Sequence, residues 1–432
     1  MDYRKEPHGL FMVIDNKSFY ASVECIKLGL NPLTTALVVL SEQPNTNGGL
    51  ILATSPRAKK DFGIKNVSRQ RNLPNDPELI VVPPRMNLYI EKSLEINRIF
   101  HHFAAEKDCY PYSIDETIVD MTHSWHLFGK TPEEVARNIQ LAVRNQLGLY
   151  TTVGIGDNPL QAKLALDLFA KHTHEMISRL TYENFAKKIW PITDLTKVWS
   201  IGDRTAAHLV RMGIFSMDDL AHTDPRWIRQ EMGVIGLQLF ALAWGIDRSK
   251  LDHVIAPKAV DISNSQVLPR DYRTQTEIEV VIKEIGEQVA SRLRHRNKKT
   301  TRVSLWIGYS FAAAEETGSG GFAHQIKIDP TDSTRVLNRY LLKLFEENWQ
   351  GETIRNVGVS FGDLVAGNEF QLNLFLSPKK QLKQFDLDKV VDEIRDRYGT
   401  TSLFYTHSLL DGGTMRQRAG LVGGHNGGNA FD

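Results

Sequence analysis

Two acidic residues stand side by side in the stretch YSIDETIVDM, residues 112–121. Asp115 and Glu116 interrupt an otherwise apolar pattern that predicts a pair of strands. Burying two adjacent carboxylates costs several kcal/mol unless a cation neutralises them. Because no Lys or Arg lies close by in the sequence, a bound metal ion is the cation that this pattern suggests.

A third acid strengthens this interpretation. The apolar run LFMVID, residues 10–15, predicts a buried strand that ends at Asp15. Mg²⁺ prefers oxygen ligands, and two divalent ions can serve phosphoryl transfer. Asp15, Asp115 and Glu116 supply such ligands, and the carbonyl of Asn16 adds a neutral one. The alternative is that Asp115 and Glu116 only turn a hairpin, and for that pair alone it is the stronger interpretation.

The order of the surrounding elements explains how these acids can meet. When the insert at residues 31–80 is left out, the first 180 residues predict strand, helix, strand, strand, helix, strand, which is the split βαβ motif. The first strand and the central hairpin are usually neighbours in this motif. We therefore expect the three acids to converge at one edge of a sheet.

The rest of the chain predicts further domains. A chain of 432 residues is too long for one hydrophobic core. Residues 181–250 are predicted to be helical, residues 260–375 mix helices with strands, and the glycine-rich end, LVGGHNGGNAFD, is expected to be disordered. The net charge of +1, two cysteines and no long apolar run predict a cytoplasmic protein without a disulfide framework or membrane span.

Four segments resemble signature sequences of the Y-family, translesion DNA polymerases: IDNKSFYASVE, TSPRAKKDFGIK, YSIDE and VGIGDNPLQAKLALDLFAK. The chain is most similar to the UmuC-like branch of Gram-positive chromosomes and mobile elements. The resemblance implies an α+β, multidomain right-hand polymerase. Its expected parts are a palm with the split βαβ motif (1–30 and 81–180), small fingers (31–80), a helical thumb (181–250), a linker (251–259), an α+β little finger (260–370) and a C-terminal tail (376–432).

The resemblance also implies roles for single residues. Asp15, Asp115 and Glu116 would be catalytic and, with Asn16, would hold two Mg²⁺ ions, for which Mn²⁺ is a substitute. Tyr20 falls at the steric gate, an aromatic ring that clashes with a 2′-hydroxyl, although core packing is the alternative. The residues expected to bind the incoming nucleotide are Phe19, Tyr20, Arg57, Lys60 and Lys171, although surface lysines usually have no specific role. The sequence departs from several relatives at Lys17, where they have an acid.

Two segments predict contacts with primer–template DNA. WSIGDRTAAHLVRMGI, residues 199–214, resembles a helix–hairpin–helix whose turn, Ile201–Gly202, would present backbone N–H groups to a phosphate, although an ordinary helical hairpin is the alternative. RLRHRNKKTTR, residues 292–302, has no acid, and a solvated surface is the alternative to phosphate contact. Its basic residues are Arg292, Arg294, Arg296, Lys298, Lys299 and Arg302.

The stretch QLNLF, residues 371–375, resembles the short motif with which bacterial polymerases bind the sliding clamp. Gln371 would make polar contacts, and Leu372, Leu374 and Phe375 would provide the apolar ones. The alternative is a last edge strand. The UmuC-like resemblance also implies possible accessory subunits.

The predicted function is low-fidelity, template-directed translesion synthesis from dNTPs in an SOS-type damage response. The expected domains leave no room for a proofreading exonuclease. One alternative is a catalytically silent adaptor that binds DNA and bridges the clamp to other factors, which retention of all three acids disfavours. Another is a nucleotide cyclase on the same palm motif, which the DNA-binding segments disfavour.

Overall fold

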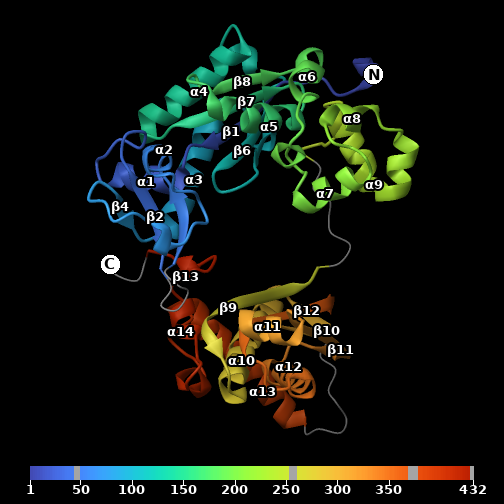
Figure 1. Cartoon of the computed structure of the whole chain (residues 1–432). Coiled ribbons are helices and arrows are strands. Elements are labelled where there is room, and N and C mark those ends of the chain that lie inside the picture. The colour runs from blue at the N-terminus through green and yellow to red at the C-terminus, as the bar shows by residue number, and fades with distance from the viewer. Residues whose placement is uncertain (43–48, 253–259, 368–377, 429–432) are drawn as a thin grey trace. The chain divides into compact units, whose positions relative to one another are not determined.

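The computed structural model describes residues 1–42, 49–252, 260–367 and 378–428 (Figure 1). The chain divides into two compact units, Met1–Leu40 with Leu50–Val254 and Ser41–Gly49 with Ile255–Asp432. Within the described residues, no helix has the length and apolar character to cross a membrane.

A five-stranded sheet forms the centre of the first unit, in the order β5-β6-β1-β7-β8. Neighbouring strands are antiparallel except for β7 and β8, which are parallel. This arrangement places the predicted hairpin directly beside the first strand. The strands are β1 (Phe11–Asn16), β5 (Cys109–Pro111), β6 (Glu116–Asp120), β7 (Thr151–Gly156) and β8 (Ile177–Leu180).

Helices cover this sheet because their apolar faces match its buried side chains. Val13, in β1, packs against Ala162 and Leu166. The helix that carries Ala162 and Leu166 approaches β7 closely, and this approach requires glycine at position 154. A Cβ added at Gly154 would lie 2.1 Å from the Ala162 carbonyl oxygen. The helices are α1 (Phe19–Lys27), α3 (Met86–Phe100), α4 (Pro132–Leu147) and α5 (Pro159–Leu168).

The insert forms a small layer with its own core. A three-stranded sheet, in the order β3-β2-β4, packs with a short helix that begins after the Ser55 N-cap and ends at Gly63. Its elements are β2 (Leu37–Ser41), β3 (Leu50–Thr54), α2 (Pro56–Phe62) and β4 (Ile80–Val82).

The end of the first unit is helical, as predicted. Gly233 has a φ of 63° and interrupts the last helix, so that this helix is kinked. Apolar residues of these helices share one core with α5. The helices are α6 (Tyr182–Ile189), α7 (Asp203–Arg211), α8 (Met217–His222) and α9 (Pro225–Ala243).

The second unit contains an antiparallel sheet in the order β11-β10-β12-β9, and α10 and α12 pack on one of its faces (Figure 1). Large aliphatic side chains of these helices and of the inward-facing strand positions form its core. The elements are β9 (Ile262–Tyr272), α10 (Gln275–His295), β10 (Lys298–Tyr309), α11 (Phe311–Thr317), β11 (Gly321–Thr331), α12 (Thr334–Asn348) and β12 (Ile354–Ala366).

The C-terminal segment packs against β9 and α10 through polar contacts. The Tyr272 hydroxyl donates to the Gly412 carbonyl at 2.8 Å, and the Thr414 N–H donates to the buried Glu284 at 3.0 Å. The expected disorder of the glycine-rich end is wrong for residues 421–426, which form a hairpin, while residues 429–432 lie outside the described ranges. The elements are α13 (Pro378–Tyr398), α14 (Met415–Arg418), β13 (Leu421–Val422) and β14 (His425–Asn426).

Candidate active site

The three predicted acids meet where β1 ends and β6 begins. Asp15 lies directly opposite Glu116 in the antiparallel pair. Asp115 precedes β6, and its carbonyl accepts hydrogen bonds from the Asn16 N–H at 2.9 Å and from Asn16 Nδ2 at 3.0 Å. The Asp115 carboxylate accepts a hydrogen bond from Ser113 Oγ at 2.8 Å, so Asp115 also has the turn role that was the alternative interpretation.

Two lysines that lie far from the hairpin in sequence neutralise these acids. Lys171 Nζ is 3.2 Å from Asp15 Oδ2 and 3.7 Å from Glu116 Oε1. Lys163 Nζ donates to both Glu116 oxygens, at 2.7 and 2.8 Å. Asp167 lies between the lysines and pairs with each. The sequence analysis predicted Lys171 but missed Lys163 and Asp167; the signal for them was the i, i+4, i+8 spacing of the three residues.

The charged form of Asp15 remains disfavoured in spite of Lys171. Burial raises the pKa of Asp15 to about 6, and the nearby Glu116 and Asp115 act in the same direction, while Lys171 opposes them. Burial disfavours the charged form of Lys171, but Asp15, Asp167 and Glu116 outweigh it, so the pKa of Lys171 is raised. The site therefore retains an attraction for additional positive charge.

We predict that Asp15→Asn stabilises the folded protein at pH 8 when divalent ions are chelated. Ionising a carboxyl whose folded pKa is about 6, against an ordinary value of 3.8, disfavours folding by up to about 3 kcal/mol. The full difference is present above the folded pKa and disappears as the pH falls towards 4. Thermal unfolding in EDTA would measure it, and an equal gain at pH 4 and pH 8 would contradict the electrostatic cause.

The donor set fits a divalent cation. Within the described residues, no three His, Cys, Asp or Glu side chains form a ready metal-binding group. Lysines contact the Asp15 and Glu116 oxygens. However, the Oδ1 atom of Asn16 is buried and lacks a hydrogen-bond partner among those residues. Carboxylate and amide oxygens are the ligands that Mg²⁺ prefers.

Tyr20 is held by an aromatic and ionic network. Its ring stacks on Tyr89, with centroids 4.3 Å apart and an interplanar angle of 13°. The Tyr89 hydroxyl donates to Glu24 at 2.7 Å, and Arg85 binds the same carboxylate through two nitrogens, at 3.0 and 2.5 Å. Glu24 and Tyr89 are almost completely buried. The predicted nucleotide contact Phe19 is also buried, which leaves Tyr20 as the more accessible ring of the pair.

A basic cluster that the sequence analysis missed faces the acids. Lys59 Nζ donates to Ser18 Oγ at 3.2 Å. Burial lowers the pKa of Lys59, and repulsion by Lys17 and Lys171 adds to this effect. Burial and Lys171 likewise lower the pKa of Lys17. The three lysines come from separate segments: Lys17 follows β1, Lys59 lies in α2, and Lys171 follows α5 and is 3.2 Å from Asp15.

The two α2 residues that were predicted to bind the nucleotide, Arg57 and Lys60, have surroundings that differ from those of Lys59. Arg57 forms ion pairs with Asp61 at 3.0 Å and with Glu78 at 2.5 Å, within the small insert layer. Lys60 is exposed. Adjacent helix positions point about 100° apart, so Lys59 and Lys60 cannot both face the acids. Lys59 is the lysine that does.

Models of one family match two parts of the chain. The "impB/mucB/samB family" matches residues 14–167, and its C-terminal domain matches residues 260–374. The chain belongs to the impB/mucB/samB family. The acids, Tyr20, Lys59 and Lys171 all lie within or just beyond the first match.

The impB/mucB/samB relatives include a Bacillus subtilis protein named for UV-damage repair, UvrX. It is 40% identical over 427 residues, covering 98% of this chain and 99% of UvrX. "DNA polymerase IV 2" of the same organism is 36% identical over 420 residues, covering 96% and 98%. The predicted relation to UmuC-like Y-family DNA polymerases is confirmed.

A solved Y-family DNA polymerase chimera of Dbh and Dpo4 segments matches this chain with a TM-score of 0.65 at 19% identity. The match covers 83% of this chain and 99% of the chimera. At this level of identity the likeness establishes the fold. The predicted α+β polymerase fold class is therefore confirmed.

The predicted helix–hairpin–helix turn of this family member is only partly suited to bind phosphate. Ser200 has a φ of 77°, and Gly202 is the exposed N-cap of α7. The Ile201 side chain is buried, and its N–H donates to the Val198 carbonyl at 3.0 Å. Gly202 therefore remains the better candidate for a backbone contact.

The predicted basic segment at residues 292–302 does not act as one patch. Arg294 is mostly buried and pairs with Asp392 at 2.5 Å, while it also donates to Asp332 and Thr334. Arg302 pairs with Asp261 and Asp363, and Lys299 is buried. We do not expect Arg294 to contact a phosphate, because its charge is already paired with Asp392. The exposed members are Arg292, Arg296 and Lys298.

The predicted clamp-binding residues, Gln371, Leu372, Leu374 and Phe375, lie outside the described residues. Clamp binding therefore stays a prediction.

Proposed function

We propose that this DNA-directed DNA polymerase carries out low-fidelity translesion synthesis, adding dNTPs to a primer 3′-hydroxyl at the Asp15–Asp115–Glu116 site. The observation that carries the proposal is the meeting of these acids across β1 and β6 in a chain of this family. A catalytically silent adaptor would not need three retained carboxylates at the cost in stability that the raised pKa of Asp15 implies.

Divalent metal ions, generally used by this family, would be held by Asp15, Asp115 and Glu116, with Asn16 as a neutral donor. When two Mg²⁺ or Mn²⁺ ions are bound, they supply activation of the attacking hydroxyl and stabilisation of charge on the phosphoryl group. Lys163 contributes by fixing both oxygens of Glu116, so that this carboxylate is oriented before substrate arrives.

The lysines have a separate role with the triphosphate. Lys171, Lys59 and Lys17 come from different segments and concentrate positive charge beside the acids. A triphosphate would relieve the repulsion among them and release Lys171 from Asp15. Binding of the nucleotide would thus free Asp15 for its catalytic role, while Tyr20 would lie under the sugar.

We predict that Lys59→Ala raises the KM for dNTP about 10-fold, as expected for one lost charge-assisted hydrogen bond, with a smaller change in kcat. Lys60→Ala is the matched control on the same helix, and it should leave KM nearly unchanged. Steady-state single-nucleotide insertion measures both variants. An equal effect of the two substitutions would contradict the orientation of α2 described above.

Contacts with primer–template DNA would come from Gly202 and from the exposed Arg292, Arg296 and Lys298. QLNLF, residues 371–375, would bind the sliding clamp, and accessory subunits would act with the polymerase, as in UmuC-like enzymes. A protein with these partners would act in the bacterial cytoplasm.

Primer extension by the purified chain tests the proposed function. The protein is given Mg²⁺, dNTPs and a primer on either an undamaged template or a template with one abasic site, with and without the sliding clamp. Extension past the abasic site is expected. Absence of extension on every template, with the clamp present and DNA binding intact, would favour the adaptor and overturn the proposal.

A further inference from the structure

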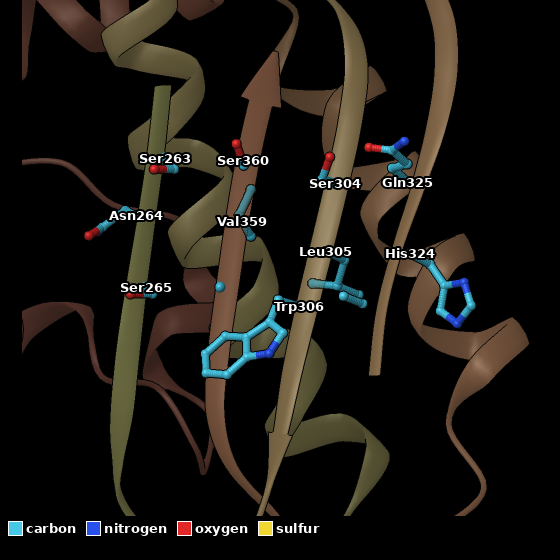
Figure 2. Close-up of a pocket in the computed structure, with 12 residues that line it drawn as sticks. Ser263, Asn264, Ser265, Ser304, Leu305, Trp306, His324, Gln325, Val359 and Ser360 are labelled. Carbon is cyan, nitrogen blue, oxygen red and sulfur yellow. The ribbon is translucent and has the colours of Figure 1, made fainter. Parts of the chain in front are cut away.

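Asp167 is a charged residue beside the candidate active site that has no role in the mechanism proposed above. It lies in the last turn of α5, and its side chain is 26% exposed. In the second unit, a hollow of about 590 Å³ lies on the sheet, but the described residues that line it include no Asp, Glu, Lys or Arg (Figure 2). That hollow therefore offers no ion pair, whereas Asp167 forms two.

The position of Asp167 is unfavourable for the helix that carries it. α5 ends at Leu168, and its last turn contains no basic residue. The free carbonyl groups at the end of a helix carry partial negative charge, so an acid in the last turn is destabilising. Two lysines compensate for it: Lys163 Nζ is 3.1 Å from Asp167 Oδ2, and Lys171 Nζ is 2.9 Å from Asp167 Oδ1. Helix stability alone therefore does not explain an acid at this position.

Asp167 is the nearest of the three carboxylates that pair with Lys171 among the described residues. The other two, Asp15 at 3.2 Å and Glu116 at 3.7 Å, are proposed metal ligands. A cation bound to those two carboxylates would weaken their attraction for the ammonium group. Asp167 is not one of the proposed ligands, so its ion pair with Lys171 would persist.

The two lysines depend on Asp167 to different degrees. Lys163 Nζ donates to both Glu116 oxygens at shorter distances, 2.7 and 2.8 Å, and its side chain is only 10% exposed. Lys171 lies in the short turn Ala170–His172 beyond the end of α5, and its side chain is 34% exposed. Loss of Asp167 should therefore affect the placement of Lys171 much more than that of Lys163.

We propose that Asp167 is a positioning residue, which anchors the Lys171 ammonium group so that it can turn from Asp15 to the triphosphate without leaving the site. The inference rests on the proposed function, and it adds a residue that acts without touching the nucleotide. A lysine side chain has many rotamers, and ordering them opposes binding. A lysine that is already held at the site loses less of this freedom when the triphosphate arrives.

Steady-state insertion of a single nucleotide tests this role. Asp167→Ala should raise the KM for dNTP about 10-fold and change kcat less than about 3-fold, because Lys171 loses one charge-assisted hydrogen bond but keeps its charge. Asp167→Asn should recover part of the loss, since its amide oxygen can still accept from Lys171. Glu279→Gln is the matched control, because Glu279 pairs with Lys283 four residues later on α10 and its side chain is 18% exposed. It should leave KM unchanged.

A double-mutant comparison distinguishes positioning from a general structural role. In a Lys171→Ala protein, the further change Asp167→Ala should raise KM less than about 2-fold, because no ammonium group remains to be positioned. A further 10-fold rise in that protein would overturn the proposal, since Asp167 would then act independently of Lys171. Wild-type KM in Asp167→Ala alone would also overturn it.

A binding measurement separates this proposal from the proposed function. Equilibrium binding of dTTP to the protein on a dideoxy-terminated primer–template, with adenine as the templating base, requires no turnover. Asp167→Ala should bind dTTP about 10-fold more weakly than wild type. Inactivity of the wild type in primer extension, together with this difference in binding, would contradict the proposed function alone. An active wild type with equal dTTP binding by the two proteins would contradict the positioning role alone.

Discussion

Asp115→Asn is expected to reduce nucleotide incorporation by at least ~100-fold, as for removal of a central electrostatic group from an active site. Asparagine keeps the size of the side chain and can still accept the hydrogen bond from Ser113 Oγ, so the turn before β6 should persist. Only the negative charge is lost. Because Asp115 contributes to the raised pKa of Asp15, removing that charge should also relieve repulsion in the folded state.

The expected signature is therefore loss of activity with unchanged or increased thermal stability. Single-nucleotide insertion and thermal unfolding would be measured on the same preparations. Asp120→Asn is the matched control, since Asp120 ends the same strand and its Oδ1 accepts from the Thr122 N–H at 2.9 Å, which asparagine also permits. Comparable activity of the two variants would remove Asp115 from the catalytic assignment.

The sequence was sufficient to predict where the acids would meet. The apolar run that ends at Asp15 and the alternating pattern after Glu116 each specify a strand, and the split βαβ order makes those strands neighbours. Antiparallel pairing then fixes Asp15 opposite Glu116. This part was predictable because strand periodicity and chain order together limit the register to few choices.

The neutralising lysines were harder to predict. A lysine on a helix usually lies in solvent, and no local feature distinguishes Lys59 from its neighbour Lys60. For Lys163, the local signal was its spacing from Asp167 and Lys171. Their roles depend on how α5 packs on β7 and how α2 is oriented, and both follow from long-range packing. Glycine at position 154 was a further clue, since it permits the close approach of α5.

At the basic run, residues 292–302, the local sequence pattern led to a prediction that a long-range contact does not support. A local count of charges favoured a phosphate-binding surface, but the partner of Arg294 is Asp392, about a hundred residues later in the chain. A buried guanidinium needs such a partner, and a local sequence pattern cannot reveal an acid so distant in sequence. The C-terminal segment thus supplies charges that complete the second unit.

Tyr20→Ala is expected to lower discrimination against ribonucleotides by roughly 10- to 200-fold, the range for a steric difference of one small group in an enclosed pocket. Without the ring, a 2′-hydroxyl no longer meets an obstacle beneath the sugar. The ratio of kcat/KM for dNTP and rNTP measures the effect. Discrimination equal to that of wild type would exclude Tyr20 as the gate and leave it a packing residue beside Phe19.

Tyr89 stacks on Tyr20 and also donates a hydrogen bond to Glu24, so two substitutions of Tyr89 can separate these contributions. Tyr89→Leu removes the ring on which Tyr20 stacks, a contact worth about 0.5–1.5 kcal/mol, so discrimination should fall roughly 2- to 10-fold. Tyr89→Phe keeps that stack but leaves Glu24 without the hydroxyl donor, which should cost about 1–3 kcal/mol of stability and little discrimination. If both variants lost discrimination equally, the hydroxyl and the Glu24–Arg85 pair, rather than the stack, would position the gate.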